Sequence, residues 1–501
     1  MSNYDLFAPY PISPAKITRL AGYGSANYKV EDLTGQTYLV KHHMDPESFK
    51  RIEAENKIMA HLSAQLPIEV SSPSHDKLIT YPDGSFSRML CFINGVFLKD
   101  VEATPELSFN FGKIIALSHQ SLGSYKTVEI EAFDHKWNLM NCLDSVEDMD
   151  LISDPSQRKI VNYFLEQYKQ VCADPLRKLP KQIIHNDLND WNVLVSDNEI
   201  KGIIDFGDLC YAPKICDLAI AMAYLLLDTP TPLIRAVDLI EGYLSIQKLD
   251  EKEIELLYYL IPARLCVSVI SSNKERSQGN TEDYIFVTEH KAWALLSKWF
   301  EMNPILFKNS LMKPLGFQQL NSLPTLISKR KKHLSSALSL SFDDPIHMTS
   351  AAFQYMYAAN GDTYLDAYNN IPHVGHCHPE VTQAAARQIN KLNTNTRYLY
   401  EALMGYSERL LKYFPHTLDK VIFVNSGSEA SDLAIRMAQN HTSNKHILVL
   451  ADGYHGHTRM GIDISAYKFD GKGGNGVNEN ITVLPLPKIY QGLQSSGKAY
   501  A

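Results

Sequence analysis

Two acidic residues and one amide stand at a spacing that suits the transfer of a phosphoryl group. Asp187 and Asn192 lie five residues apart, between apolar runs at residues 182–184 and 193–195. Asp205 follows another short apolar run after a polar turn. This alternation predicts a strand, a loop, a strand, a turn and a third strand. The three oxygen-bearing side chains would then lie together at one edge.

The residue types fit the two needs of phosphoryl transfer. One carboxylate must orient or deprotonate the acceptor hydroxyl, and hard oxygen ligands must hold magnesium beside the phosphate oxygens. Asp187 suits the first role as the catalytic residue, and Asn192 and Asp205 suit the second as metal ligands. The alternative is a surface hairpin in which these side chains only shape turns.

Two spaced motifs resemble one family of enzymes. The H-N-D-L-N-D-W-N block at residues 185–192, followed by D-F-G at residues 205–207, resembles the catalytic and metal loops of the aminoglycoside phosphotransferase and choline kinase family, relatives of protein kinases. The motifs look most like the hydroxylysine kinase branch. The resemblance covers about residues 17–300 and implies an α+β, two-lobed, protein-kinase-like domain. It also implies that His185 and Asp217 support the catalytic loop.

The segment before these motifs supplies candidate nucleotide contacts. Gly22 and Gly24 stand in a turn before an alternating segment, and Lys41 ends the strand that follows. The resemblance implies a strand lysine on the nucleotide phosphates, held by a glutamate of the next helix. Lys41 with Glu53 matches that arrangement best, and Glu55 is the alternative partner. From the residues alone, an ordinary hairpin and a solvated lysine would look the same.

Three further stretches bear on the site, and the first two have two interpretations each. Residues 88–95 fit the strand and hinge between two kinase lobes, or an ordinary core strand. Asp134 and Trp137 are candidates for lining the acceptor site, although an acidic residue beside an aromatic residue is often structural. Helices are expected across residues 233–300, where Arg264 lies on an otherwise apolar face and is interpreted as a buried, paired arginine.

The sequence changes in character from residue 343 onward. Five blocks in one order resemble class III pyridoxal-phosphate (PLP) aminotransferases, including phospholyases that cleave amino-alcohol phosphates. The blocks are residues 364–366, 373–379, 392–398, 424–430 and 453–458. The resemblance covers about residues 341–501 and implies an incomplete α/β aminotransferase domain of the type I PLP fold.

One of these blocks has the features of a phosphate site. It follows an expected strand at residues 421–424 and opens an expected helix at residues 429–439. Backbone amides at a helix start, together with a serine hydroxyl, bind phosphate groups well. The resemblance implies that Tyr454 stacks on the cofactor ring. The expected PLP-binding residues are Ser426, Gly427, Ser428, Tyr454 and His455.

The lysine that would form the Schiff base is not found in this chain. In the family it belongs well beyond Thr458, and neither Lys468 nor Lys472 lies in a matching motif. Because electron-sink chemistry depends on that imine, we expect no transaminase or phospholyase turnover from these 501 residues. The H-C-H run at residues 376–378 resembles a set of metal ligands, but adjacent residues rarely converge on one ion.

Breaks in periodicity predict the domain boundaries. Residues 1–310 form the kinase-like domain, with an N-lobe at about 1–93 and a C-lobe at about 96–310. Residues 311–342, which contain prolines, a glycine and a basic cluster, form a linker. Residues 343–501 form the N-terminal part of an aminotransferase domain.

Composition restricts the class of protein and its partners. The chain has 45% hydrophobic and 21% charged residues, which is typical of a soluble protein. A net charge of -8 without a basic block argues against nucleic acid as the main partner. Seven cysteines without a C-x-x-C pair suit free thiols in a reducing compartment. With no signal peptide and no uninterrupted apolar run of spanning length, we expect a cytoplasmic protein without a membrane partner.

These inferences combine into one leading function and two alternatives. The leading hypothesis is a kinase that uses Mg²⁺ and ATP or GTP to phosphorylate the hydroxyl of an amino alcohol such as hydroxylysine or ethanolamine. In the first alternative, the full-length parent is a PLP-dependent class III transaminase, and the kinase-like domain is a regulatory module. In the second, the chain is not an enzyme, and its aminotransferase part serves to form a homodimer.

Overall fold

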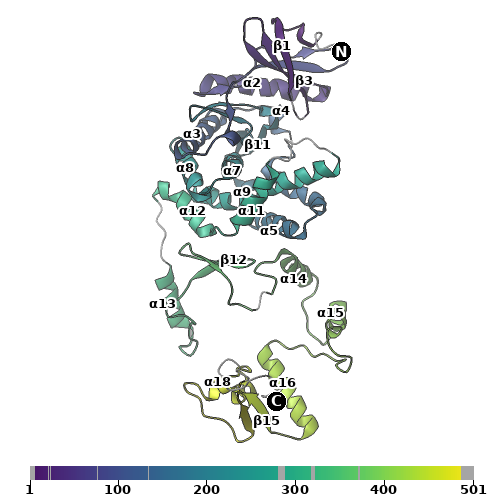
Figure 1. The fold of residues 1–501 in the computed structure, drawn as a ribbon, viewed down its shortest axis with the longest axis vertical. Coiled ribbons are helices and arrows are strands. Elements are labelled where there is room, and N and C mark those ends of the chain that lie inside the picture. Colours follow the sequence, from purple (N-terminus) through teal and green to yellow (C-terminus); the bar gives the residue numbers. More distant parts are fainter. Residues whose placement is uncertain are drawn as a thin grey trace, which may run out of the picture. The chain divides into compact units, whose positions relative to one another are not determined.

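The fold is known from a computed structural model that describes residues 6–20, 22, 24–75, 77–133, 135–279, 288–316, 322–370 and 373–486. The chain divides into two compact units, Met1–Lys391 and Leu392–Ala501. Figure 1 shows the helices and strands of both units.

A five-stranded antiparallel sheet forms the first lobe of unit 1. Its strand order is β1-β2-β3-β6-β5. The strands are β1 (Pro14–Leu20), β2 (Ala26–Asp32), β3 (Thr37–His43), β6 (Phe86–Cys91) and β5 (Ile79–Thr80). Val30, Val40 and Met89 from the three central strands pack against Leu6 and Phe7. Helix α2 (Phe49–Gln65) lies between this sheet and the helical lobe (Figure 1).

The second lobe is mainly helical. Its α-helices are α3 (Pro105–Leu122), α4 (Val128–Glu131), α5 (Pro155–Val171), α6 (Ala173–Lys178), α7 (Lys214–Leu225), α8 (Pro232–Leu244), α9 (Glu251–Ser277), α11 (Glu289–Trp299) and α12 (Pro304–Met312), and residues Leu139–Leu151 form the 3-10 segment η3. Nearly all of α7 is buried, and it packs against α9 at the centre of the main hydrophobic core.

Helix α9 is the longest element of the structure. It is long and apolar enough to cross a membrane, but 78% of its most apolar window is buried in unit 1, as in the central helix of a folded core. It also contains Pro262, which has no amide hydrogen to donate to the carbonyl one turn earlier. That carbonyl belongs to Tyr258 and accepts a hydrogen bond from Trp299 Nε1 at 3.0 Å. The indole therefore compensates for the proline inside the helix.

Short strands hold the loops that carry the motifs. One sheet has the order β4-β10-β9-β7, and β8 pairs with β11. The strands are β4 (Glu69–Val70), β10 (Glu199–Ile203), β9 (Val193–Ser196), β7 (Val96–Phe97), β8 (Lys181–Ile184) and β11 (Cys210–Pro213). The order β8, loop, β9, turn, β10 confirms the arrangement predicted around Asp187 and Asn192.

Residues 323–391, which begin inside the predicted linker at 311–342, complete unit 1. They form α13 (Leu323–His333), β12 (Met348–Ala352), β13 (Tyr355–Ala358), β14 (Thr363–Leu365) and α14 (Pro379–Lys391). Phe353 and Tyr357 are buried in the main core, and Tyr357 Oη donates to Phe300 O at 2.6 Å. Asn303 Nδ2 donates to Ala358 O at 2.9 Å. The compact unit thus ends at Lys391, whereas the sequence boundary was predicted at residue 342.

Unit 2 is built around one helix and a parallel strand pair. Its elements are α15 (Glu401–Leu411), α16 (Gly427–Thr442), β15 (Ile447–Leu450), α17 (Arg459–Asp463), α18 (Ala466–Phe469) and β16 (Ile481–Leu484). The helix expected at residues 429–439 lies within α16, but the strand expected at residues 421–424 is wrong. A strand needs a ladder partner, and the described residues pair none with this segment. Ile422 therefore remains 58% exposed.

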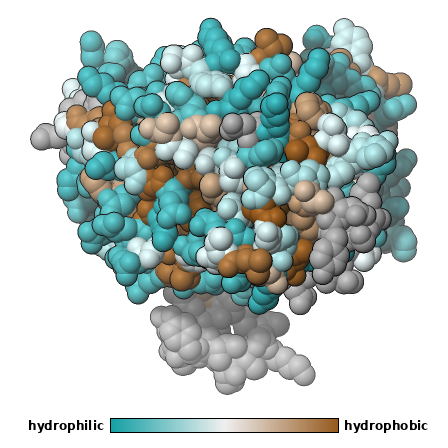
Figure 2. Space-filling view, turned by 90° about the horizontal axis from the view of Figure 1, so that it is seen from above, coloured by the Kyte–Doolittle hydropathy of each residue, from teal (hydrophilic) through white to brown (hydrophobic). Residues whose placement is uncertain are grey.

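The surface at the N-lobe end is mostly polar. Hydrophilic residues cover most of the face seen from above, and apolar residues gather on it in small groups (Figure 2). Scattered apolar residues of this kind are normal on a folded protein.

Candidate active site

The catalytic loop, residues 185–192, is anchored by one buried carboxylate. Asp217 of α7 accepts the backbone amide of His185 at 3.2 Å and that of Asn186 at 2.8 Å. It is also 3.1 Å from His119 Nε2, and the other ring nitrogen of His119 lies 2.9 Å from Tyr243 Oη. Asn186 has a left-handed φ of 65°, so these bonds fix a turn that few residues adopt. Asp217 lies where the sequence placed it, as a support for the loop.

His185 joins the catalytic loop to the metal loop, residues 205–208. Its Nε2 lies 3.1 Å from Ile204 O, and its ring centroid is 4.6 Å from that of Phe206. Burial lowers the pKa of His185, which keeps the ring neutral. A neutral ring with Nε2 protonated can donate to that carbonyl, so His185 also lies where a support of the loop is expected.

Asp187 lies at the centre of a network of donors. Its Oδ1 is 2.8 Å from Arg264 Nη2, and its Oδ2 is 2.7 Å from Asn192 Nδ2. Asn189 Nδ2 donates to both oxygens at 3.0 Å. Burial raises the pKa of Asp187 to about 7, while the positive charge of Arg264 opposes this rise and the negative charge of Asp208 adds to it. A carboxylate with such a pKa can take up a proton near neutral pH.

Arg264 reaches Asp187 from α9. Its side chain is 3% exposed, and its guanidinium carbon lies 4.8 Å from the ring centroid of Trp137 and 5.6 Å from that of Tyr224. Nη1 also donates to Trp137 O at 3.3 Å. The interpretation of Arg264 as a buried, paired arginine is confirmed. Trp137 is thus linked to Asp187 through its contacts with Arg264. The other acceptor candidate, Asp134, lies outside the described residues.

Lys41 and Asp205 form an ion pair across 164 residues of sequence. Nζ of Lys41, on β3, lies 2.8 Å from Asp205 Oδ1. The positive charge of Lys41 lowers the pKa of Asp205 to about 2, so this carboxylate stays ionised. Asp205 itself has a left-handed φ of 59°, which turns the chain into the short 3-10 turn η4 (Phe206–Asp208).

The structure corrects the expected partner of Lys41. Glu53 is half exposed and lies 3.5 Å from Lys57 on the same helix, so it does not reach Lys41. The reason is the helical period, because residues two apart point to different faces. Glu55, the alternative, points inward and is fully buried, and its ion-pair partners are Arg51 and Arg88. No ion pair between Lys41 and Glu55 is formed among the described residues.

Gly22 and Gly24 lie in the turn between β1 and β2. Gly24 has a φ of 72°, a conformation that side chains rarely adopt, so the turn needs glycine at this position. A Cβ atom at Gly22 would lie 1.8 Å from the side chain of Asn27. The geometry of the turn alone therefore explains why glycine stands at both positions. Their contact with a nucleotide stays a prediction.

The oxygen atoms of Asn192 and Asp205 suit a magnesium ion. Asn192 uses its Nδ2 to donate to Asp187 O at 2.9 Å and to the Asp187 carboxylate, which leaves its Oδ1 as a hard oxygen donor. Asp205 supplies an ionised carboxylate. One carboxylate and one amide oxygen match what magnesium takes from a protein when phosphate oxygens supply the rest. The residues present thus fit the ion that the family resemblance implies.

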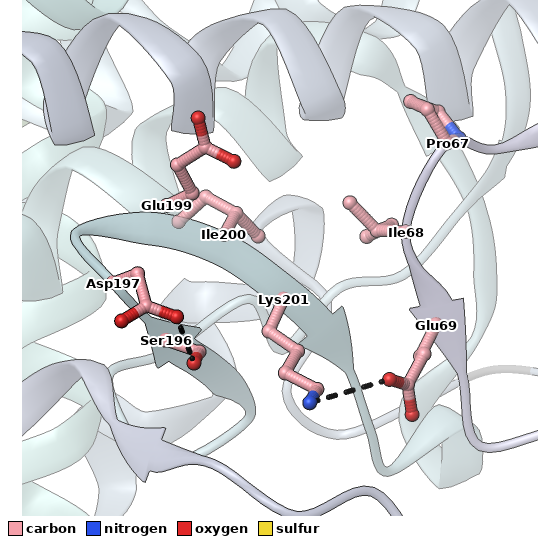
Figure 3. Close-up of a pocket in the computed structure, with 8 residues that line it drawn as sticks. All are labelled: Pro67, Ile68, Glu69, Ser196, Asp197, Glu199, Ile200 and Lys201. Atoms are coloured by element: carbon pink, nitrogen blue, oxygen red, sulfur yellow. Dashed lines mark hydrogen bonds and ion pairs between the residues drawn. The ribbon is translucent and has the colours of Figure 1, made fainter.

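Two pockets lie apart from the predicted site residues. A pocket of about 450 Å³ opens beside the turn between β9 and β10, where Glu69, Asp197, Glu199 and Lys201 line it (Figure 3). Lys201 lies 3.6 Å from Glu69 across it. A smaller pocket of about 110 Å³ lies beside Asp190. Neither pocket contains Asp187, Asn192 or Asp205.

Sequence reasoning missed several residues of the site. Arg51 and Arg88 hold Glu55, Asn189 holds Asp187, and His135 Nε2 lies 3.0 Å from Asp208 Oδ1. The position of Asn189 inside the catalytic motif is a signal that could have drawn attention to it. Arg51 and Glu55 lie one helical turn apart, whereas the contacts of Arg88 with Glu55 and of His135 with Asp208 join segments far apart in the sequence, for which spacing gives no signal.

The start of α16 in unit 2 brings together part of the expected PLP site. Ser426 is the N-cap, and its hydroxyl accepts the amide of Glu429 at 3.2 Å. Ser428 Oγ lies 3.1 Å from His457 Nδ1, and a Cβ atom at Gly456 would lie 2.7 Å from Ser428 Cα. The loop that carries residues 454–457 therefore packs closely on the helix start.

The remaining residues of that set lie beside this loop. Tyr454 is 54% exposed, and its ring centroid is 6.2 Å from that of Tyr467. The amide of His455 donates to Ser465 Oγ at 2.8 Å. Gly427 has open space where a side chain would begin, and a helix start leaves amides for an anion. Ser426, Gly427 and Ser428 at this helix start fit the phosphate end of PLP.

Comparisons with known proteins match two separate parts of the chain. The model of the phosphotransferase enzyme family matches residues 16–252, and that of class-III aminotransferases matches residues 341–495. The first part is similar to a hydroxylysine kinase of Danio rerio, with 27% identity over 317 residues, which cover 58% of this chain and 88% of that protein.

Two curated relatives are similar to the second part. An alanine–glyoxylate aminotransferase 2-like protein of Drosophila melanogaster is 38% identical over 187 residues, which cover 37% of this chain and 38% of that protein. An ethanolamine-phosphate phospho-lyase homolog of Caenorhabditis elegans is 34% identical over 187 residues, which cover 37% of this chain and 40% of that protein. The chain thus spans about two fifths of the length of these relatives.

Proposed function

We propose that this chain, in which a kinase-like phosphotransferase-family domain precedes a class-III aminotransferase segment, transfers the γ-phosphate of a nucleotide to the hydroxyl of an amino alcohol. The observation that carries the proposal is the hydrogen-bonded group of Asp187, Asn192 and Arg264 at the loop between β8 and β9. The ion pair of Lys41 and Asp205 supports it, and the negative charge of Asp205 adds to the rise in the pKa of Asp187.

Each residue has a distinct role in this proposal. Asp187 orients the acceptor hydroxyl and takes its proton, because its raised pKa suits a base near neutral pH. Lys41 places a positive charge at the nucleotide phosphates. Asn192 and Asp205 would hold magnesium, which neutralises charge on the phosphate oxygens when bound. ATP and GTP are both compatible with these roles.

The relatives narrow the proposed acceptor. One is named a hydroxylysine kinase and another an ethanolamine-phosphate phospho-lyase homolog, so the two parts of this chain are similar to proteins whose names concern amino alcohols and their phosphates. Hydroxylysine and ethanolamine are therefore the acceptors we propose. A complete aminotransferase-type domain with PLP would then remove the phosphate that the kinase domain adds.

The direct test is phosphate transfer by the purified chain, followed by phosphorus NMR. The panel holds hydroxylysine, ethanolamine, choline, homoserine and an aminoglycoside, each with Mg²⁺ and ATP or GTP. We expect a new phosphomonoester with one amino alcohol. Asp187→Asn should lower the rate by a factor of about 10² to 10⁴ and leave nucleotide affinity nearly unchanged.

Asp197→Asn is the matched control. Asp197 lies on the exposed turn between β9 and β10 with a left-handed φ of 51°, which asparagine adopts readily. Full activity of Asp187→Asn would refute the role of Asp187. Absence of transfer across the panel, with binding of magnesium and nucleotide intact, would instead favour a regulatory module beside a class III transaminase. A homodimer through residues 343–501 and a cytoplasmic location stay predictions.

A further inference from the structure

Arg51 connects helix α2 to the metal loop. Its Nη1 lies 2.8 Å from Glu55 Oε1, one turn further along the helix, and donates at 2.8 Å to Gly207 O. Gly207 lies in η4, 156 residues later in the sequence. One terminal nitrogen of this side chain therefore joins both lobes of the kinase-like domain.

The α2 end of this connection is fixed. Glu55 has no solvent exposure, and its Oε2 lies 3.0 Å from Arg88 Nη1, on β6. Arg88 also donates from Nη1 to Asn56 Oδ1 at 3.1 Å. Since a buried carboxylate between two arginines cannot move without losing both, Glu55 is a rigid anchor for Arg51.

A third contact sets the plane of the guanidinium. The guanidinium carbon of Arg51 lies 4.5 Å from the ring centroid of Phe133, in the segment between α4 and η3. The side chain is 23% exposed, so solvent screens this group only in part. Arg51 thus has neighbours in α2, in the metal loop and in the segment that carries Phe133.

The metal loop is short and has almost no regular secondary structure of its own, so its backbone conformation depends on contacts with other segments. Asp205 adopts a left-handed conformation, and η4 is a single 3-10 turn whose middle residue is a glycine without a side chain. The Gly207 carbonyl lies two residues from the carboxylate that would bind magnesium. A bond to that carbonyl therefore limits the orientation of the peptide groups that follow Asp205.

We propose that Arg51 is a positioning residue that fixes the Gly207 carbonyl on the Glu55 anchor, so that Asp205 is held where a divalent cation and the nucleotide bind. This inference rests on the proposed phosphotransfer function. It extends that function by making cation affinity depend on α2, an element of the other lobe.

The test measures cation dependence as well as activity. Affinity for a fluorescent ATP analogue is titrated over a range of Mg²⁺ concentrations, and phosphate transfer is followed over the same range. We expect Arg51→Gln to raise the Mg²⁺ concentration for half-maximal nucleotide binding by about tenfold. Arg51→Lys keeps the positive charge but has a single ammonium nitrogen in place of the planar guanidinium. Its affinity for Mg²⁺ should therefore lie between that of Arg51→Gln and that of the wild type.

Lys57→Gln is the matched control. Lys57 is on the same helix, loses the same charge and also pairs with a glutamate, but its pair with Glu53 is exposed and contacts no loop of the site. We expect less than a twofold change for this variant. Thermal unfolding of each variant shows whether the fold is kept.

The outcomes separate the two proposals. Half-maximal Mg²⁺ concentrations equal to wild type in both Arg51 variants would overturn the inference, as would a lower melting temperature without a change in cation dependence. If the wild type transfers no phosphate to any acceptor of the panel, the proposed function fails. The nucleotide-binding titration then still decides the role of Arg51, because it requires no turnover.

Discussion

Arg264 controls the charge of the side chain that the proposed chemistry needs. Its Nη2 lies 2.8 Å from Asp187 Oδ1, and its positive charge counteracts the rise in the pKa of Asp187 that burial causes. Asp187 works as a base only when ionised, so the rate should fall as the pH drops below about 7. Arg264→Gln removes the opposing charge, raises the pKa of Asp187 further, and should move this acid limb upward by roughly one unit or more.

The measurement is the pH dependence of kcat/KM for the wild type and the variant. Arg276→Gln is the control, since Arg276 lies on the same helix but pairs with Glu289 and is half exposed. An acid limb at the same pH in Arg264→Gln and the wild type would contradict this role.

The roles of single residues differed in how well the sequence predicted them. Asp187 and Asn192 come together because a five-residue spacing within one loop fixes their distance. Glu53 was wrong as the partner of Lys41, because two helix positions so close in sequence differ only in the face they occupy, which tertiary packing decides. Arg264 was recognised as paired, but its partner lies 77 residues away, beyond the reach of local patterns.

At the scale of elements, one buried helix positions the catalytic loop. Asp217 of α7 accepts two consecutive loop amides and lies next to His119. In Asp217→Asn, one of the two accepting oxygens is replaced by an NH₂ group. This group would face a backbone amide of the loop from which it cannot accept a hydrogen bond. We expect the variant to lose about 1–3 kcal/mol of stability, since a buried donor is left unsatisfied. It should also lose roughly tenfold or more in kcat, with a smaller change in KM for the nucleotide.

Thermal unfolding and steady-state kinetics test this prediction together. Asp238→Asn on α8 is the control, because its partner is Arg235 on the same helix. Wild-type stability and kcat in Asp217→Asn would show that α7 does not hold the loop through this carboxylate.

Elements with strong local signals were predictable, and those that depend on partners were not. The strands around the catalytic loop have apolar runs and a polar turn, and they form as expected. Residues 421–424 have the same apolar character, yet no described residue pairs with them, so they remain coil. A strand forms only when a second segment pairs with it, and the sequence of one segment does not show whether that partner is present.

At the scale of the whole molecule, the family boundary and the packing boundary differ. The class-III aminotransferase match begins at residue 341, but residues up to Lys391 pack with the kinase-like domain. The ring of Phe353 lies 5.1 Å from that of Phe300 and 5.2 Å from that of Tyr163. The sequence pattern around Phe353 and that around Phe300 and Tyr163 do not predict this contact. Tyr163 and Phe353 lie in segments that resemble different families, so each segment would be expected to pack within its own domain.

This packing predicts that residues after 342 stabilise the kinase-like domain. Phe353 is 7% exposed, so Phe353→Ala should leave a cavity and lower the free energy of unfolding of unit 1 by about 3–5 kcal/mol. Phe342→Ala is the matched control, because Phe342 is 54% exposed and should change that value by less than about 0.5 kcal/mol. Thermal unfolding with and without nucleotide identifies the transition of the kinase-like domain, since bound nucleotide raises its melting temperature. Equal melting temperatures for this transition in the two variants would mean that the kinase-like domain does not depend on this packing.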